Sequence, residues 1–283
     1  MRLSPPPNAP ANWGRTKPVN FLVPLLLLLQ SAPGVVPLTN AHAHNDYEHN
    51  RPLFDALSHG FCSVEADIFV TPEKTLLVGH NKADLKPERT LQKLYLDPLR
   101  QRIKEQSGSV FKDSNGKPVP FTLLIDIKTD AASTYPVLHE VLSQYADMFT
   151  EVRDGKMTER AITVILSGSR PSLNELAKQS PRYAGYDGRF TDLNSDVPSH
   201  LMPMISDNWA LKFSWNGNGT MSAKDREKLD QVVQQAHSKG RKLRFWATPE
   251  KETFWQMQLD CKIDVINTDR LNELKLFLLA HSK

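Results

Sequence analysis

Cysteine is scarce in this chain of 283 residues, which contains only Cys62 and Cys261. Two cysteines so far apart cannot build a disulfide framework or a cysteine-rich metal site. Each stands where we expect a buried strand to begin. We therefore expect both to be small core residues, with one long-range disulfide in an oxidising compartment as the alternative. The function must reside in other residues.

The chain also lacks an excess of charge of one sign. Lys and Arg number 35 against 32 Asp and Glu, and the basic residues are spread along the chain. This pattern gives no basis for nucleic-acid binding. A weakly basic surface is compatible with a phosphate or anionic lipid substrate and with contact to a membrane surface, although a mixed solvated surface is the simpler interpretation. The 40% hydrophobic content is typical of a globular protein with a large core.

Only one long apolar run is present, and it lies near the N-terminus. Arg15 and Lys17 precede the leucine-rich run 21–29, and small residues up to Ala32 follow it. The run is shorter than the ~20 apolar residues that span a bilayer, and its flanks are typical of a signal peptide. We therefore predict a leader over residues 1–32, cleaved near Ala32, and a secreted or periplasmic protein. An uncleaved membrane anchor and a buried first strand are the alternatives.

After the leader, short runs rich in Val and Ile alternate with amphipathic segments, which indicates βαβ units and a parallel sheet. Eight strands are expected, the number that closes a TIM barrel. We predict a single (β/α)8 domain over residues 33–283 and a monomer. Ser172 with Glu175, and Ser222 with Asp225, are helix start signals. The predicted strands are 35–43, 63–70, 121–129, 162–167, 183–186, 202–206, 243–247 and 263–267, and the predicted helices are 53–58, 135–145, 172–179, 223–238 and 271–280.

Carboxylates gather on two of these strands. Glu65 and Asp67 are two residues apart, so they face the same side of the second strand, and Asp126 lies on the third. Inward-facing carboxylates side by side are costly unless a cation neutralises them. A hard divalent ion with oxygen ligands, Mg²⁺ or Ca²⁺, is the natural partner. Ion pairs with Lys128 and an arginine are the structural alternative.

Three histidines fall near the ends of the first two strands. His42 and His44 share one face by the two-residue rule, and His80 follows the second strand. In a TIM barrel the reactive groups stand at the C-terminal ends of the strands. Imidazole titrates near neutral pH, which suits general acid and base catalysis. A single histidine there would more often be structural, but three beside carboxylates favour a catalytic site.

The combined pattern of these motifs resembles a known superfamily. The run His44 … Glu65-x-Asp67 … His80, followed by Asp126-x-Lys128, resembles the glycerophosphodiester phosphodiesterase and phosphatidylinositol-specific phospholipase C-like superfamily. More narrowly, His-x-His-Asn-Asp-Tyr, Ser-Val-Glu-Ala-Asp and Arg89-Thr-Leu resemble the branch named for altered inheritance of mitochondria. Arg244-Phe-Trp246-Ala and Ile266-Asn-Thr-Asp269 resemble the last two strands of that superfamily.

The resemblance implies a metal-dependent phosphoric diester hydrolase that acts on a glycerophosphodiester or a phospholipid-like substrate. It implies that His44 and His80 are the catalytic acid and base. The expected metal ligands are Glu65, Asp67 and Asp126, and the expected substrate or phosphate contacts are His42, Asn45, Lys128 and Trp246.

Some motifs depart from the main glycerophosphodiesterase pattern. His-Asn-Asp stands in place of His-Arg-Gly, the Pro-Glu-Asn-Thr segment is missing, and His80-Asn81 stands in place of His-Asp. A phosphate-binding arginine and one metal carboxylate are therefore missing, and Asp46 is only a weak candidate to replace the carboxylate. The glycerol headgroup is thus an open question. Tyr186-Asp187-Gly-Arg189 lies in the right region to contribute specificity.

Two other functions remain open. His42-x-His44 is also how amidohydrolase and polymerase-histidinol-phosphatase barrels begin, in which both imidazoles bind a transition metal. Those barrels need further histidines on middle strands, where this chain offers only His200 and His237. The other alternative is a catalytically silent barrel that binds lipid headgroups, since a fold does not guarantee an activity. Tryptophans such as Trp209 and Trp215 would supply its surface.

Overall fold

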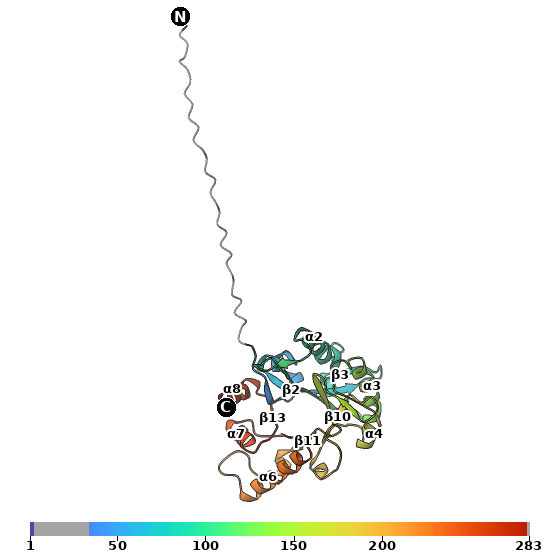
Figure 1. The fold of residues 1–283 in the computed structure, drawn as a ribbon, viewed down its shortest axis with the longest axis vertical. Helices are drawn as coiled ribbons and strands as arrows, with labels where there is room; N and C mark the ends of the chain where they lie inside the picture. The colour runs from blue at the N-terminus through green and yellow to red at the C-terminus, as the bar shows by residue number, and fades with distance from the viewer. Residues whose placement is uncertain (3–33, 282–283) are drawn as a thin grey trace. The chain divides into compact units, whose positions relative to one another are not determined.

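The computed structural model describes residues 1–2 and 34–281, and the barrel domain begins at Val35. Eight parallel strands form a closed ring in the order β1-β2-β6-β9-β10-β11-β12-β13, because β1 pairs with both β2 and β13 (Figure 1). The predicted TIM barrel is therefore confirmed. The strands are β1 (Leu38–Ala43), β2 (Phe61–Val70), β6 (Phe121–Ile127), β9 (Ile162–Gly168), β10 (Ala184–Gly188), β11 (Met204–Asn208), β12 (Lys242–Trp246) and β13 (Val265–Thr268).

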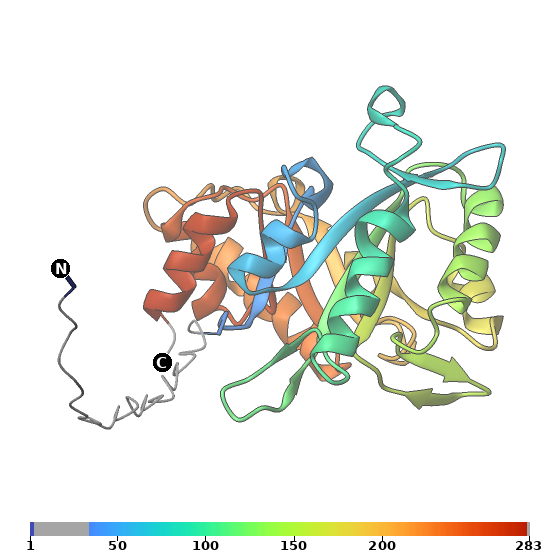
Figure 2. The same cartoon turned by 90° about the horizontal axis from the view of Figure 1, so that it is seen from above.

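Helices cover the outside of this ring (Figures 1 and 2). The predicted caps are present, since the Ser172 and Ser222 side chains accept hydrogen bonds from the third residue after each. A third cap, Asp130, starts α3 four residues before the predicted start. Helices α2, α5 and α7 lie outside the predicted ranges. The helices are α1 (Phe54–His59), α2 (Asp97–Glu105), α3 (Ala131–Ser143), α4 (Leu173–Lys178), α5 (Trp209–Lys212), α6 (Ala223–Ser238), α7 (Glu252–Asp260) and α8 (Leu271–His281).

Short strands and single helical turns lie in the loops at both ends of the barrel. β3 (Leu76–Val78) pairs antiparallel with the far end of β2 and brings the chain back toward the C-terminal ends of the strands. Two hairpins precede β6 and β9 and lie at the opposite, N-terminal end (Figure 2). They are β4 (Phe111–Lys112) with β5 (Pro118–Val119), and β7 (Glu151–Arg153) with β8 (Lys156–Thr158). The remaining turns are η1 (Asp46–Glu48), η2 (Lys82–Asp84), η3 (Gln92–Leu96) and η4 (Phe190–Asp192).

The core has an outer part, between strands and helices, and a small inner part. Leu124, Ile165, Met204 and Val265 form a separate buried cluster. Leu124 precedes Asp126 by two residues on β6, so the two side chains share the inner face of the strand. This layer therefore fills the barrel beneath the C-terminal ends of the strands, where the acidic side chains stand.

Both cysteines are buried and free, as expected of small core residues. Cys62 lies in β2, and burial raises the pKa of its thiol to about 12. Cys261 does not begin a strand as expected, because it caps the end of α7 and β13 begins only at Val265. A disulfide between them is therefore absent from the part of the chain that the structure describes.

Two expectations concern membranes and the leader. Among residues 1–2 and 34–281, none of the helices has the length and apolar character needed to cross a bilayer. The predicted leader, except for its first two residues, lies outside the described residues.

Candidate active site

A cavity of about 440 Å³ opens at the C-terminal ends of the barrel strands. Most of the residues predicted for the site line it, drawn from strands that are far apart in the sequence. His42 is the exception among them. The lining residues are His44, Asn45, Glu65, Asp67, His80, Asp126, Lys128, Ser167, Gly168, Arg189, Arg244 and Trp246.

The register between neighbouring strands brings the three carboxylates together. β2 and β6 run parallel with Asp67 opposite Asp126, and Glu65 lies two residues earlier on β2. One oxygen from each of Glu65, Asp67 and Asp126, the acidic trio, lies within 4.8 Å of the others. Three carboxylate oxygens at this spacing are the donor set that suits a hard divalent cation. The trio therefore fits the predicted metal site.

Burial and mutual repulsion perturb the trio. Desolvation, together with the charge of Glu65, raises the pKa of Asp67 to about 6. Desolvation also raises the pKa of Asp126. Lys128 counters both effects, since its Nζ lies 2.9 Å from Asp67 Oδ2 and 3.2 Å from Asp126 Oδ1. Arg244 also lies 3.6 Å from Glu65 Oε2, so the expected ion pairs with Lys128 and an arginine are present. Two cations still leave one of the three carboxylate charges unbalanced, and a bound cation would relieve the remaining repulsion.

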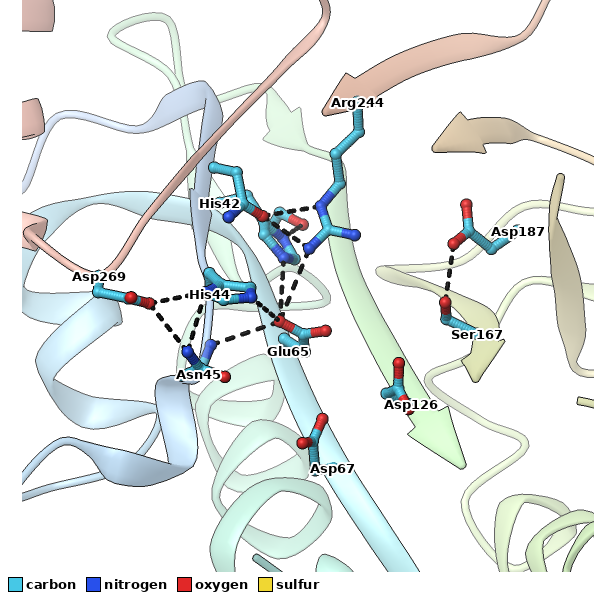
Figure 3. Close-up of polar contacts among 12 residues, drawn as sticks. His42, His44, Asn45, Glu65, Asp67, Asp126, Ser167, Asp187, Arg244 and Asp269 are labelled. Atoms are coloured by element: carbon cyan, nitrogen blue, oxygen red, sulfur yellow. Dashed lines mark hydrogen bonds and ion pairs between the residues drawn. The ribbon is translucent and has the colours of Figure 1, made fainter. Parts of the chain in front are cut away.

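His44 stands just beyond β1, held by a carboxylate from the last strand. Its backbone N–H donates to the carbonyl of Thr268, and its Nδ1 lies 2.7 Å from Asp269 Oδ1. Because a carboxylate only accepts, we assign the proton to Nδ1, which also has the Asn45 amide nitrogen at 3.0 Å. Nε2 lies 3.7 Å from Glu65 Oε2 (Figure 3). Burial lowers the pKa of His44, but the hydrogen bond to Asp269 and the charge of Glu65 outweigh it and raise the pKa.

His80 is positioned by β3, which turns back along β2. The Gly79 N–H donates to the carbonyl of Asp67. His80 Nδ1 then lies 2.9 Å from the Tyr47 hydroxyl oxygen and 3.2 Å from Asp67 Oδ2, while the Tyr47 hydroxyl donates to Asp67 Oδ2 over 2.6 Å. Both neighbours can accept the Nδ1 proton, so Nε2 is left as the free base. Tyr47 thus orients His80 against the acidic trio.

His42 lies behind the trio and off the cavity wall. Its side chain is fully buried, Nδ1 lies 2.7 Å from Ser63 Oγ, and Nε2 lies 4.0 Å from Glu65 Oε2. Burial and the nearby charge of Arg244 lower its pKa well below the usual value. The two-residue rule gave the correct face of the strand but not the depth. His42 Nε2 has no hydrogen-bond partner among the described residues, and the ring does not line the cavity in which we expected it to contact substrate.

Two more of the candidate residues, Asn45 and Trp246, line the cavity, whereas Asp46 does not. Asn45 lines the cavity in a left-handed conformation (φ 48°), which asparagine tolerates better than most residues, and its side chain reaches Asp269 Oδ1 at 3.3 Å. Trp246 lines the cavity at the end of β12. Asp46 points away into the core, where it accepts from the Leu53 N–H and the Tyr95 hydroxyl. Asp46 therefore does not replace the missing metal carboxylate.

Several site residues lie outside the predicted set. Arg244 is buried on β12, donates to Asn267 Oδ1 and lies 3.6 Å from Glu65 Oε2. The sequence contained a signal for the position of Arg244, because this residue precedes Trp246 by two residues and therefore shares its face of the strand. Asp269 and Arg189 follow directly after β13 and β10, where the fold places reactive groups.

Gly168 lies so close to Asp126 that the site has no room for a side chain at this position. It has φ +66°, and a Cβ added there would lie 2.3 Å from Asp126 Oδ1 and 2.5 Å from the carbonyl oxygen of Ile127. We expect Gly168→Ala to cost about 1–3 kcal/mol in free energy of unfolding and to displace Asp126. Thermal denaturation measures the cost.

Gly116→Ala is the matched control, because Gly116 also has a positive φ (+77°) but nothing lies within 4 Å of an added Cβ. The control isolates the backbone penalty from the clash. Equal destabilisation by the two substitutions would contradict the close approach to Asp126.

The closed ring, the acidic trio and the two flanking histidines define a TIM barrel with a candidate hydrolytic site at the C-terminal ends of its strands. Comparison with known proteins identifies the family. A model described as the AIM6-like phosphodiesterase domain matches residues 30–187, so the chain belongs to this family. The predicted resemblance is confirmed, and the phosphodiesterase domain supports a phosphodiester hydrolase.

Similar sequences come from fungi. Altered inheritance of mitochondria protein 6 from Lachancea thermotolerans is 31% identical over 285 residues, covering 85% of this chain and 65% of the relative. The protein of the same name from Eremothecium gossypii is 28% identical over 272 residues, covering 85% of this chain and 69% of the relative. The chain thus spans about two thirds of the length of these relatives.

Solved structures share the fold. A phosphodiesterase from Oleispira antarctica, in complex with the product sn-glycerol-3-phosphate, matches with a TM-score of 0.51 and 14% identity over 85% of this chain and 97% of its own. A glycerophosphodiester phosphodiesterase from Parabacteroides distasonis matches with a TM-score of 0.50 and 14% identity over 87% of this chain and 100% of its own. At this identity the likeness establishes the barrel alone.

Proposed function

We propose that this chain is a divalent-cation-dependent phosphodiesterase that uses two histidines as acid and base. The observation that carries the proposal is the acidic trio of Glu65, Asp67 and Asp126, with ligand oxygens within 4.8 Å of one another, flanked by His44 and His80 in one cavity. Mg²⁺ or Ca²⁺ held by the trio would polarise the phosphoryl oxygens of the substrate.

The charges around the cavity support an anionic substrate. The acidic trio, Asp187 and Asp269 carry five negative charges, whereas Lys128, Arg189, Arg244 and a protonated His44 carry four positive ones. One divalent ion would reverse this balance to a single positive charge. A phosphodiester carries one negative charge and would neutralise it, while Lys128 stabilises charge that develops on the phosphoryl oxygens.

The two histidines are suited to opposite proton transfers. His80 has Nδ1 turned to Tyr47 and Asp67, so its free Nε2 would accept the proton of the attacking hydroxyl, from water or from the substrate itself. His44 has a raised pKa because Asp269 and Glu65 hold its protonated form, so it would donate a proton to the leaving alkoxide. Asp269 and Tyr47 act by orienting the two rings.

The proposed substrate is a glycerophosphodiester or a phospholipid-like diester, free or at a membrane surface. A cavity of about 440 Å³ has room for a headgroup of this size. We also propose that residues 1–32 are a cleaved leader and that the domain acts outside the cytoplasm, which the composition of that segment supports. A new N-terminus near Ala32 in protein recovered from cells is the expected result.

Hydrolysis assays test the proposed activity. Bis(p-nitrophenyl) phosphate and a panel of glycerophosphodiesters are offered to the protein with Mg²⁺, with Ca²⁺ or with a chelator. We expect turnover with at least one ion and its loss on chelation, reversed when the ion is restored. Folded protein that turns over none of these substrates with any ion would leave the silent, headgroup-binding barrel as the better interpretation.

The rival functions find less support. His200 lies before β11, at the opposite end of the strands, and His237 at the end of α6 pairs with Asp264. Neither lines the cavity, so the histidines of a transition-metal barrel are missing from the described site. Trp209 is 2% exposed, and its indole N–H donates to the Trp215 carbonyl, so it anchors a loop.

A further inference from the structure

We infer that Arg189 is a phosphate-binding residue of this site, which contacts a nonbridging oxygen of the phosphodiester from the wall opposite His44. The inference rests on the proposed function for the identity of the substrate. Its physical basis is a separate group of residues, Ser167, Asp187 and Arg189, on β9 and β10.

Arg189 stands across the cavity from the histidines. It directly follows β10, and β10 lies four strands from β1 around the ring of eight, so the two face each other. Its side chain lines the cavity and is 27% exposed. The neighbouring strand β9 places Ser167 opposite Asp126 of β6. The acidic trio and Arg189 therefore border the same space.

Two side chains fix the orientation of the guanidinium. Arg189 Nη1 donates to Asp187 Oδ2 over 2.7 Å, and Nη2 donates to Ser167 Oγ over 3.2 Å. Ser167 in turn donates to the same Asp187 oxygen over 2.8 Å (Figure 3). Asp187 and Ser167 are both buried, so the two groups that hold the guanidinium are shielded from water, while Arg189 itself stays partly exposed. A guanidinium held in advance loses little freedom on binding an anion.

The guanidinium of Arg189 still has N–H donors available for a ligand. A guanidinium has five N–H donors, and those of Arg189 with acceptors are on Nη1 and Nη2. Its Nε–H has no acceptor among residues 34–281, and Ser167 takes only one of the two Nη2 protons. Nε and Nη2 form the side of a guanidinium that binds phosphate oxygens in pairs. This capacity is what a phosphodiester in the cavity would use.

A fully buried arginine, Arg241, shows what a purely structural role looks like here. Arg241 is 1% exposed, and its guanidinium donates to backbone carbonyls of Asp192, Ser195 and Val197, which fastens one loop. Arg189 differs because a carboxylate and a hydroxyl anchor it together with two backbone carbonyls, and because it faces the cavity. Arg189 is held in place, keeps free N–H donors and faces the cavity, which is what a phosphate-binding residue requires.

Three variants test the inference by turnover of bis(p-nitrophenyl) phosphate. We expect Arg189→Ala to lower turnover by about 10²-fold. Guanidinium chloride, at concentrations that do not unfold the protein, is expected to raise the turnover of this variant by about 10-fold or more. Arg189→Lys keeps a cation beside Asp187 and is expected to fold, but to lose about 10-fold because an ammonium cannot bind two oxygens side by side. Turnover within about threefold of wild type in both variants overturns the inference.

Arg170→Ala is the matched control. Arg170 lies close by, stacks on the ring of Tyr186 at 4.2 Å and does not line the cavity; it reaches a lining residue only through the backbone carbonyl of Gly168, at 3.2 Å. Its variant is expected to keep wild-type turnover and to gain nothing from guanidinium. Rescue of Arg170→Ala, or failure to rescue a folded Arg189→Ala, counts against a direct contact between Arg189 and phosphate.

Binding of inorganic phosphate separates this inference from the proposed function. Calorimetry with Mg²⁺ present is expected to show affinity about 10-fold weaker in Arg189→Lys than in wild type. Arg189-dependent binding in a protein that hydrolyses nothing would support the inference and contradict the proposed function. Equal binding by wild type and variant overturns the inference even if turnover is found, and absence of both binding and turnover in wild type overturns both.

Discussion

Replacing either His44 or His80 by alanine is expected to lower turnover of bis(p-nitrophenyl) phosphate by about 10²–10⁴-fold. Each ring has Nδ1 occupied by a neighbour, Asp269 for His44 and Tyr47 with Asp67 for His80, and so presents Nε2 for proton transfer. Alanine removes that group without adding bulk. Initial rates, measured at saturating substrate and in the presence of the divalent ion, give the size of the effect.

His237→Ala is the matched control for these two variants. His237 also pairs with a carboxylate, Asp264, but at the end of α6, outside the cavity. We expect it to keep wild-type turnover. If His44→Ala and His80→Ala retained turnover within a few-fold of this control, the acid and base would have to be other groups. Loss in only one of the two would limit the mechanism to a single proton-transfer residue.

Replacing Glu65 by glutamine is expected to abolish ion binding and, with it, the ion-dependent part of turnover. An ion at 100 times its dissociation constant stabilises a protein by about 2.7 kcal/mol, which corresponds to several degrees in Tm for a domain of this size. Wild type should show this rise with Mg²⁺ or Ca²⁺. Glu65→Gln should not, because a neutral amide oxygen removes one negative charge from the trio and binds a divalent cation much more weakly than a carboxylate does.

Glu151→Gln provides the comparison, since Glu151 lies on β7 at the other end of the barrel and pairs only with Arg153 among the described side chains. It should show the same ion-induced rise in Tm as wild type. A rise of equal size in Glu65→Gln would place the ion elsewhere, and the proposed role of the trio would then be wrong. Scanning fluorimetry with and without chelator distinguishes these results.

The fold could be predicted where local signals agree with the tertiary structure. All eight predicted strands overlap the observed ones and differ from them only at their ends. Helix α6 (Ala223–Ser238) has the predicted bounds, and Ser222 caps its start. The segment between β2 and β6 was not predictable in this way. It holds β3, whose pairing depends on β2 extending beyond the barrel, and a π-helical turn before α2, which periodicity does not reveal.

The site could be predicted in part for a related reason. The two-residue rule on strands correctly joined Glu65 with Asp67, and the register of β2 and β6 added Asp126. The same rule says which way a side chain faces but not how far along the strand the cavity reaches, and so it misplaced His42. The orientation of Arg189 depends on Ser167 and Asp187 from two strands, which no short motif contains.

The closure of the ring has a consequence for biosynthesis. His44 stands at the end of the first strand, yet the carboxylate that orients its ring, Asp269, directly follows the last one, β13. A nascent chain on the ribosome exposes His44, the acidic trio and His80 long before Asp269 has been made. The pair of His44 and Asp269 is therefore assembled only after β13 has emerged and closed the ring against β1. Under the proposed mechanism, a chain still being translated would hold the parts of the site without a positioned proton donor.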